Sequence, residues 1–257
     1  MSDQVQVGKK RIGKKAKIVI LIAVVLVSLF VATVIVQTCF YFFAPRSTPK
    51  YIAHMGYNYA YTGNTEKAFK AAAEMDFYGI ETDIRKSSTG VYVCHHDPLV
   101  KIKPEEETHF CTFVEYLEIC KSKDKMAIVE LKEDFPSEDV KAVLELIDQH
   151  YDRKKVSIIS FFYGVLLRVK EEDATIPLQY LSEKKNDPNF DKCLNEKISI
   201  DVSHKILTKK LVQTFHKAGL TVNVWNVNKP YDQTMARIRG VDYITSDRLC
   251  NNAYVRE

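Results

Sequence analysis

The sequence predicts an α/β protein with a (β/α)8 TIM barrel, preceded by one N-terminal transmembrane helix. Three observations predict this fold. From Tyr51 onward, short β-branched segments alternate with amphipathic helical segments, which is typical of a parallel sheet covered by helices. Roughly eight strands in about 210 residues suit a closed barrel, and no G-x-G-x-x-G follows the first strand to favour a doubly wound sheet. A long apolar run without charges precedes the first strand.

The N-terminal apolar run has the length of a membrane anchor. Residues 18–36 carry no charge and the run resumes at 39–43, whereas a spanning helix needs about 20 apolar residues. A cleaved signal peptide is the alternative, but its apolar region is usually about 7–15 residues long and ends at a small-residue site. This run ends in Tyr41-Phe42-Phe43, which suits a membrane interface. We expect a basic tail at 1–17, an uncleaved anchor at 18–43, a linker at 44–50 and the barrel at 51–257.

The charges around the anchor predict its orientation. Residues 1–17 carry six positive charges and one negative charge, so by the positive-inside rule they lie in the cytoplasm and the barrel lies outside it. With a net charge of +4 for the whole chain, the part after residue 17 has a net charge of only −1. A nearly neutral barrel offers no basic surface to nucleic acid, so we expect no such partner.

The predicted elements follow one another in regular alternation. Val91–His95 is expected to be a short hairpin strand. The other predicted strands are Tyr51–Gly56, Gly79–Arg85, Met126–Leu131, Val156–Phe161, Ile176–Leu181, Ile198–Val202, Thr221–Val227 and Val241–Thr245. The predicted helices are Thr65–Met75, Thr112–Lys121, Ser137–Tyr151, Tyr163–Glu172, Thr208–Ala218 and Tyr231–Ile238.

The cysteines give little guidance on chemistry. Cys39 lies in the anchor, and five others follow it. An exported location permits disulfides, but the odd number leaves their pairing open. No C-x-x-C is present, so a zinc site is not expected.

Polar side chains gather near the ends of the predicted strands, where barrel enzymes carry their active sites. They are His54 after the first strand, Glu81 and Asp83 in the second, His95, His96 and Asp97 after the hairpin strand, and Glu130 and Lys132 after Val129. Residues two apart in a strand point to the same face, so Glu81 lies beside Asp83 and Glu130 beside Lys132. If those faces line the barrel mouth, three carboxylates converge.

Three neighbouring carboxylates repel one another unless a cation or protons compensate them. A hard divalent ion with oxygen ligands, Ca²⁺ or Mg²⁺, is therefore the natural occupant. Two nearby histidines would supply an acid and a base that change charge near neutral pH. Taken singly, E-x-D and E-x-K also suit ordinary ion pairs on a solvated strand face.

The motifs resemble, in their order, those of the glycerophosphodiester phosphodiesterase family. Ile52-Ala53-His54-Met55-Gly56 is similar to its H-R-G, Asn64-Thr65 through Gly79-Ile80-Glu81-Thr82-Asp83 to its E-N-T…G-x-E-x-D, Val93-Cys94-His95-His96-Asp97 to its V-x-x-H-D, Val129-Glu130-Leu131-Lys132 to its I-E-I-K, Ser160-Phe161 to its S-F, Val224-Trp225-Asn226-Val227-Asn228 to its V-W-T-V-N, and Gly240-Val241-Asp242 to Thr245-Ser246-Asp247 to its G-V-D…T-D. The similar segments span 51–249, essentially the whole expected barrel.

The resemblance implies a barrel that holds one divalent metal on Glu81, Asp83 and Glu130. It implies general acid and base roles for His54 and His96, because the family's catalytic histidine directly precedes the aspartate. Lys132 would neutralise phosphate charge, and Trp225 would form a wall against the glycerol or the leaving group. Core packing is an equally good interpretation of Trp225.

The chain departs from the family's motifs at three places. Met55 replaces the arginine of H-R-G, Gly63 replaces the glutamate of E-N-T, and Val100-Lys101-Ile102 replaces the L-x-R after H-D. Two cations that could bind phosphate are therefore missing.

Two functions remain open from the sequence. The first is a metal-dependent hydrolase that releases glycerol phosphate and an alcohol from glycerophosphodiesters or related envelope phosphodiesters, taking a small-molecule or lipid-derived substrate. The second is a catalytically degenerate barrel that binds a phospholipid headgroup or an envelope polymer. The histidine pair and the three carboxylates favour the enzyme, whereas Met55 and Gly63 favour degeneracy. The residues do not indicate an oligomeric state.

Overall fold

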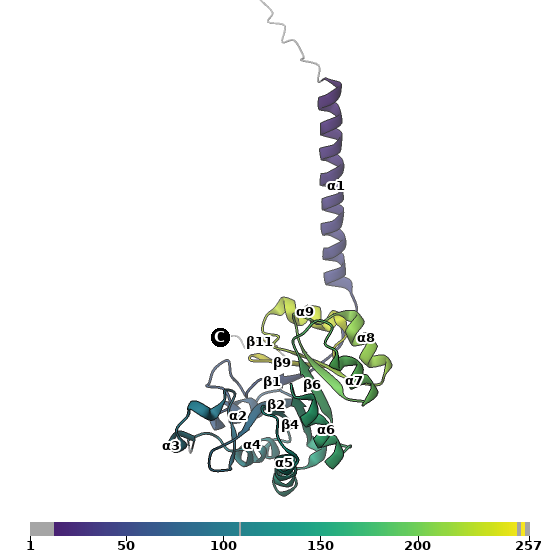
Figure 1. Cartoon of the computed structure of the whole chain (residues 1–257). Coiled ribbons are helices and arrows are strands. Elements are labelled where there is room, and N and C mark those ends of the chain that lie inside the picture. The colour runs from purple at the N-terminus through teal and green to yellow at the C-terminus, as the bar shows by residue number, and fades with distance from the viewer. Residues whose placement is uncertain (1–12, 108, 251–252, 255–257) are drawn as a thin grey trace, which may run out of the picture. The chain divides into compact units, whose positions relative to one another are not determined.

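The computed structural model describes residues 13–107, 109–250 and 253–254. The chain divides into two compact units, Met1–Pro45 and Arg46–Glu257. Figure 1 shows the first unit as one long helix and the second as a sheet curled into a barrel with helices around it.

Helix α1 (Lys14–Phe43) makes up most of the described part of the first unit. Its 30 residues rise about 45 Å at 1.5 Å per residue, whereas the hydrocarbon core of a bilayer is about 30 Å thick. Apolar side chains such as Ile20, Leu26 and Phe30 are exposed along it. Among the described residues, α1 is the one helix long and apolar enough to cross a membrane.

The second unit contains, within the described chain, a closed barrel of eight parallel strands. They are β1 (Lys50–Ala53), β2 (Gly79–Lys86), β4 (Met126–Leu131), β5 (Val156–Ser160), β6 (Leu178–Ser182), β7 (Ser199–Ser203), β8 (Val222–Trp225) and β9 (Tyr243–Ser246). The barrel closes at β1, where Ile52 lies opposite Gly79 of β2 and Thr245 of β9. This closure confirms the predicted TIM barrel.

Helices follow the strands and cover the outside of the barrel (Figure 1). They are α2 (Glu66–Ala73), α4 (Phe113–Ser122), α5 (Ser137–His150), α6 (Tyr163–Glu172), α7 (Asn189–Asn195), α8 (Lys209–Lys217) and α9 (Pro230–Arg239). Thr65, Thr112 and Thr208 begin three of them as N-caps whose side chains accept backbone hydrogen bonds. At Thr112, the side chain of Glu115 completes a capping box.

Several short elements lie outside this alternation. Strand β3 (Tyr92–Cys94) pairs antiparallel with β2, as expected for the hairpin. The turns η1 (Leu99–Lys101) and η2 (Arg153–Lys155), helix α3 (Pro104–Glu107), and the two-stranded pair β10 (Leu249–Cys250) and β11 (Ala253–Tyr254) were not predicted. Helix α7 was also not predicted, because its seven residues are too few for the helical spacing of Phe190, Cys193 and Leu194 to stand out.

Side chains alternate between two cores. On β1, Tyr51 and Ala53 belong to the large core between sheet and helices, whereas Ile52 belongs to a small cluster inside the barrel. The other buried members of that cluster are Ile128, Ile159 and Leu181, and we call these four residues the interior plug.

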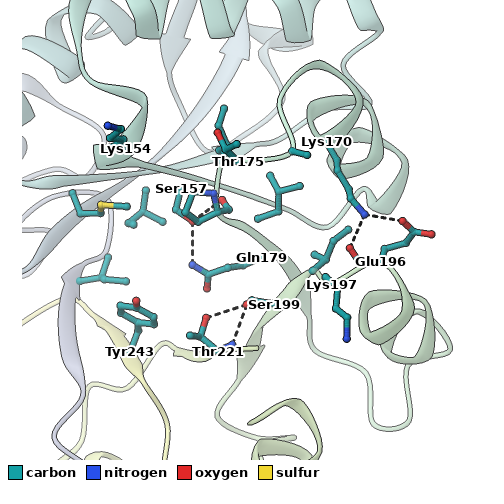
Figure 2. A pocket seen from close by; sticks show the side chains of 18 of the residues that line it. Lys154, Ser157, Lys170, Thr175, Gln179, Glu196, Lys197, Ser199, Thr221 and Tyr243 are labelled. Atoms are coloured by element: carbon teal, nitrogen blue, oxygen red, sulfur yellow. Dashed lines mark hydrogen bonds and ion pairs between the residues drawn. The ribbon is translucent and has the colours of Figure 1, made fainter. Parts of the chain in front are cut away.

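The interior plug lies between two cavities. Ile52 and Ile128 line a cavity of about 490 Å³ at the N-terminal ends of the strands. Figure 2 shows this cavity, where Gln179 Nε2 donates to Ser157 Oγ (3.2 Å). Ile159 and Leu181 line a second cavity at the C-terminal ends of the strands.

No cysteine whose side chain is described forms a disulfide. Cys39, Cys94, Cys111, Cys120 and Cys193 are free thiols. All except Cys39 are buried.

Candidate active site

The cavity at the C-terminal ends of the strands has a volume of about 200 Å³ and contains every predicted site residue. Its described lining comprises His54, Glu81, Asp83, His96, Glu130, Lys132, Ile159, Phe161, Leu181, Asp201, Trp225, Asn226 and Thr245. Pockets for drug-sized ligands have volumes of about 300–1,000 Å³. This cavity therefore suits a smaller molecule.

Three buried carboxylates form a cluster on two adjacent strands. Glu81 and Asp83 lie on β2, and Glu130 lies opposite Asp83 on β4. One carboxylate oxygen from each residue lies within 4.8 Å of the others. Oxygen donors of this kind are the ligands that Ca²⁺ and Mg²⁺ prefer. The residues therefore fit a hard divalent cation.

The surrounding chain holds these carboxylates in place. The backbone N–H of Met55 donates to Glu81 Oε2 (2.8 Å). Asn64 Nδ2 donates to Asp83 Oδ2 (2.7 Å), while Asn64 Oδ1 accepts from Thr82 Oγ1 (2.9 Å). Asn64 was not singled out from the sequence, although it belongs to the Asn64-Thr65 motif. Its role depends on a contact between residues 19 positions apart.

The charges of the cluster are strongly coupled. Burial, together with Asp83 and Glu130, raises the pKa of Glu81 well above its ordinary value. Burial and Asp83 raise the pKa of Glu130 to about 8 although Lys132 opposes them. The pKa of Asp83 is lowered because Lys132 and Asn64 outweigh the effect of burial. A bound cation would relieve this repulsion.

Lys132 adds a positive charge at the same place. Its Nζ lies 3.1 Å from Glu130 Oε1 and 3.3 Å from Asp83 Oδ1. These carboxylates raise the pKa of Lys132 against the opposing effect of burial. The ammonium group is therefore charged at neutral pH and available to an anion at this side of the cavity.

His54 is oriented by a carboxylate that follows the last barrel strand. Its Nδ1 donates to Asp247 Oδ1 (2.7 Å). Asp247 in turn accepts a short hydrogen bond from Asn228 Nδ2. The hydrogen bond and charge of His54 lower the pKa of Asp247 despite its burial. Asp247 lay in a motif quoted for the family resemblance, but the sequence assigned it no role.

His96 lies on the loop that follows β3. Its Nδ1 lies 2.9 Å from Asp97 Oδ1, and its backbone carbonyl accepts from Arg85 Nε (3.1 Å) and Nη2 (2.8 Å). Arg85 is buried and also donates to Glu133 Oε1 (2.8 Å). This loop is thereby fixed to the end of β2.

The two neighbouring histidines of this loop differ in position. His96 lines the cavity at the C-terminal ends of the strands, which we call the catalytic cavity. His95 is not part of its described lining. The His95 ring packs on Phe110 with centroids 4.5 Å apart. The choice of His96 over His95 as the catalytic histidine stays a prediction.

Aromatic side chains form one wall of the cavity. Phe161 and Trp225 meet edge to face with centroids 5.9 Å apart. Trp225 Nε1 donates to the backbone carbonyl of Asp201 (3.3 Å), which fixes the indole against β7. Asp201 itself, a buried carboxyl in this wall, was not predicted as a site residue.

The model of the glycerophosphoryl diester phosphodiesterase family matches residues 54–102 and 100–250. A search of curated proteins found no match.

Solved structures of phosphodiesterases are similar to the chain. One from Parabacteroides distasonis has 23% identity and a TM-score of 0.69, covering 79% of this chain and 94% of its own. One from Oleispira antarctica, solved with the product sn-glycerol-3-phosphate, has 20% identity and a TM-score of 0.69, covering 78% and 93%. One from Thermotoga maritima has 26% identity and a TM-score of 0.60, covering 77% and 94%.

These findings agree with the motifs and with the barrel. The family model covers most of the chain, from the first cavity residue, His54, to the end of the barrel. The chain therefore belongs to the glycerophosphoryl diester phosphodiesterase family of hydrolases.

Proposed function

We propose that this protein hydrolyses glycerophosphodiesters with one divalent cation, Ca²⁺ or Mg²⁺, held by Glu81, Asp83 and Glu130. The observation that carries the proposal is the convergence of these carboxylates, two histidines and Lys132 on one cavity. The product in the Oleispira structure supports glycerol phosphate as the released group. The cation would neutralise the carboxylates and polarise a phosphate oxygen.

We assign His54 as the general base. Because its Nδ1 hydrogen is directed at Asp247, the lone pair on Nε2 could accept a proton, and Asn226 Nδ2 lies 3.5 Å from this nitrogen. Its side chain is 20% exposed. The proton would come from a water molecule or from a glycerol hydroxyl, whichever attacks phosphorus.

We assign His96 as the general acid. Its side chain is 56% exposed, and this position at the mouth suits a departing alcohol that leaves toward solvent. His96 would give its proton to the alcohol oxygen as the phosphorus–oxygen bond breaks. Lys132 would bind a phosphate oxygen, and Trp225 would pack against carbon atoms of the substrate.

The chain supports a membrane-bound form of this activity. Helix α1 is long and apolar, and the positive charges precede its apolar run, which begins at Ile18. We propose a single-pass protein with a cytoplasmic N-terminus, whose barrel acts on phosphodiesters outside the cytoplasm, envelope phosphodiesters included. A binding protein without turnover is the competing function, because Met55 and Gly63 depart from the family's motifs.

An assay of the full chain in detergent tests the catalytic proposal. Release of glycerol phosphate from glycerophosphocholine should stop after chelation and return with Ca²⁺ or Mg²⁺. His54→Ala and His96→Ala should each lower kcat by at least about a hundredfold. The matched control is His95→Ala, which removes the neighbouring ring and should have a much smaller effect.

The outcomes separate the alternatives. Full activity after chelation would contradict the metal site. An inactive His95→Ala with a normal His96→Ala would show that the other histidine is the catalytic one. Metal-dependent binding of glycerol phosphate without any turnover would favour the binding protein.

A further inference from the structure

Asp201 is a fourth carboxyl group in the catalytic cavity, on a strand that is not adjacent to the strands of the other three. It is the middle residue of β7, its side chain lines the cavity, and the residue is 1% exposed. In the closed ring of strands, β7 lies four positions from β2 in either direction, directly across the barrel from Glu81 and Asp83. The carboxyl of Asp201 therefore faces the cavity from the wall opposite those two carboxylates.

Only one of its two oxygens has a partner. Asp201 Oδ2 accepts from Asn223 Nδ2 (2.8 Å), and the same amide nitrogen lies 3.0 Å from Thr245 Oγ1. Among the described residues, nothing forms a hydrogen bond with Asp201 Oδ1, although this atom is buried. A buried carboxyl oxygen without a partner is unfavourable. Because Asp201 lines a cavity, this unpartnered oxygen indicates that a group of a bound ligand forms the missing hydrogen bond.

The protonation state of Asp201 restricts which ligand groups can form a hydrogen bond with its Oδ1 atom. Burial and the charge of Glu130 raise the pKa of Asp201 well above its ordinary value. An ionised carboxyl accepts hydrogen bonds only, whereas the neutral acid also donates one. An alcohol hydroxyl can complete either form, because it donates and accepts. A phosphate oxygen could complete only the neutral acid, and Lys132 and the metal site offer it better partners across the cavity.

We propose that Asp201 is a specificity-determining residue that binds the terminal hydroxyl of the substrate's glycerol group. This inference rests on the proposed glycerophosphodiester hydrolysis. The phosphate lies toward β2 and β4, so the glycerol carbon farthest from phosphorus reaches toward β7. Trp225 and Phe161 pack beside its carbon atoms, and Asp201 distinguishes glycerol from a chain without the terminal hydroxyl.

The test compares two substrates that differ by one oxygen atom. Glycerophosphocholine carries the terminal hydroxyl, and 2-hydroxypropyl phosphocholine lacks it but keeps the hydroxyl beside the phosphate. The full chain should prefer the first by about 10- to 100-fold in kcat/KM, which lies within the cost of leaving a buried polar group without its hydrogen-bond partner. In Asp201→Leu this ratio should fall to about one, through a loss on the glycerol substrate alone.

Two further variants keep the test decisive. Asp201→Asn retains the shape and a polar group, should fold if Asp201→Leu does not, and should give an intermediate ratio. The matched control is Gln179→Leu, which removes a buried, unpartnered amide oxygen from the other end of the barrel (Figure 2). It should keep the wild-type ratio.

Product affinity separates this inference from the proposed function. By calorimetry with metal present, the wild type should bind sn-glycerol-3-phosphate about 10- to 100-fold more tightly than propane-1,2-diol 1-phosphate, and Asp201→Leu should bind both equally. An inactive wild type with this difference would refute the hydrolysis and support Asp201 as the hydroxyl site. Equal losses on both substrates in Asp201→Leu, or no preference in the wild type, would overturn the inference.

Discussion

Met55 and Gly63, the two positions where a cation and an anion of the family's motifs are missing, lie against each other. A Cβ atom at position 63 would lie 2.9 Å from Met55 Cβ and 3.1 Å from Asn58 Oδ1. Met55 itself has a φ of 50°, in the region that favours glycine. A larger residue at position 63 therefore has no room beside the Cβ atom of residue 55 in this backbone.

The first prediction follows from this contact. Gly63→Ala should lower the free energy of unfolding by about 1–3 kcal/mol, because the added methyl group overpacks a tight site. In a Met55→Gly background, the same substitution should cost clearly less, because the opposing Cβ is gone. Urea unfolding of the four proteins measures the coupling.

The control for this cycle is Gly164→Ala on α6. Only the tip of Arg168 comes within 4 Å of a Cβ there, at 3.9 Å. This variant should be neutral or slightly stabilising, as alanine is in a helix. Equal costs of Gly63→Ala in both backgrounds would show that Met55 is not the obstacle.

The role of Asp83 as a proposed metal ligand can be tested indirectly through Asn64. Its amide holds the carboxylate of Asp83, but it does not belong to the proposed ligand set. Asn64→Gly should weaken Ca²⁺ or Mg²⁺ affinity by about 10- to 100-fold, the usual cost of losing a residue that orients a ligand. Glycine is chosen because Asn64 has a φ of 58°. Calorimetric titration of the metal measures the effect.

Asn186→Gly is the matched control, since Asn186 also has a φ of 58° but lies outside the catalytic cavity. Its metal affinity should equal that of the wild type. Unchanged affinity in Asn64→Gly would mean that Asp83 needs no orienting partner.

At the scale of helices and strands, the carboxylate of Asp173 links the C-terminal end of α6 to the turn η2 before β5. Asp173, directly after α6, accepts from Thr175 Oγ1 (2.6 Å) and from Arg153 Nη1 (2.8 Å). These hydrogen bonds lower the pKa of Asp173 to about 2, whereas an unfolded chain has an aspartate pKa of about 3.9. The carboxylate therefore stabilises the fold fully above about pH 4, and this stabilisation is lost as the pH falls through about 2.

The third prediction is the resulting pH dependence. Asp173→Asn should lower the free energy of unfolding at pH 7, and its difference from the wild type should shrink between about pH 4 and pH 2. Asp124→Asn is the control, because Asp124 is 78% exposed in its ion pair with Lys155 and such pairs contribute little. A difference for Asp173→Asn that does not change with pH would refute the role of its charge.

The hairpin strand β3 shows how a short element serves the site. It pairs with the end of β2 through Ile84 and Cys94, and the chain then continues directly into His95 and His96. Buried Arg85 holds the carbonyl of His96. The loop that carries His96, the proposed general acid, is thus supported by the same strand that carries two proposed metal ligands.

For the whole molecule, the fourth prediction concerns membrane topology. Protease added to intact protoplasts should digest the barrel, because the positive charges before the apolar run would keep the N-terminus in the cytoplasm. An immunoblot for the barrel and for a cytoplasmic marker measures this. The marker should survive until detergent is added.

Two results would contradict the proposed topology. A barrel that survives protease until the cells are lysed would lie in the cytoplasm. A mature chain that lacks α1 and leaves the membrane fraction in a carbonate wash would identify the segment as a cleaved signal sequence.

Local patterns in the sequence were sufficient for the barrel and for the candidate residues of its mouth. The alternation of strands such as Met126–Leu131 with amphipathic helices depends on neighbours along the chain, and so does the pairing of Glu81 with Asp83 on one face. The order of these residues along the chain matched the order of the family's motifs, and this match identified them as candidate site residues. Helix α7 was missed because a helix of seven residues is too short for its apolar period to be detected.

Only the tertiary structure decided which distant residues meet. Asp247 lies 193 positions from His54, and Asp201 is 71 positions from Glu130, yet all four line or adjoin one cavity. Closure of β1 onto β9 creates the first contact, and the curvature of the sheet turns the Asp201 side chain into the cavity. A local pattern carries no information on such pairs, because they depend on how eight strands close into a ring.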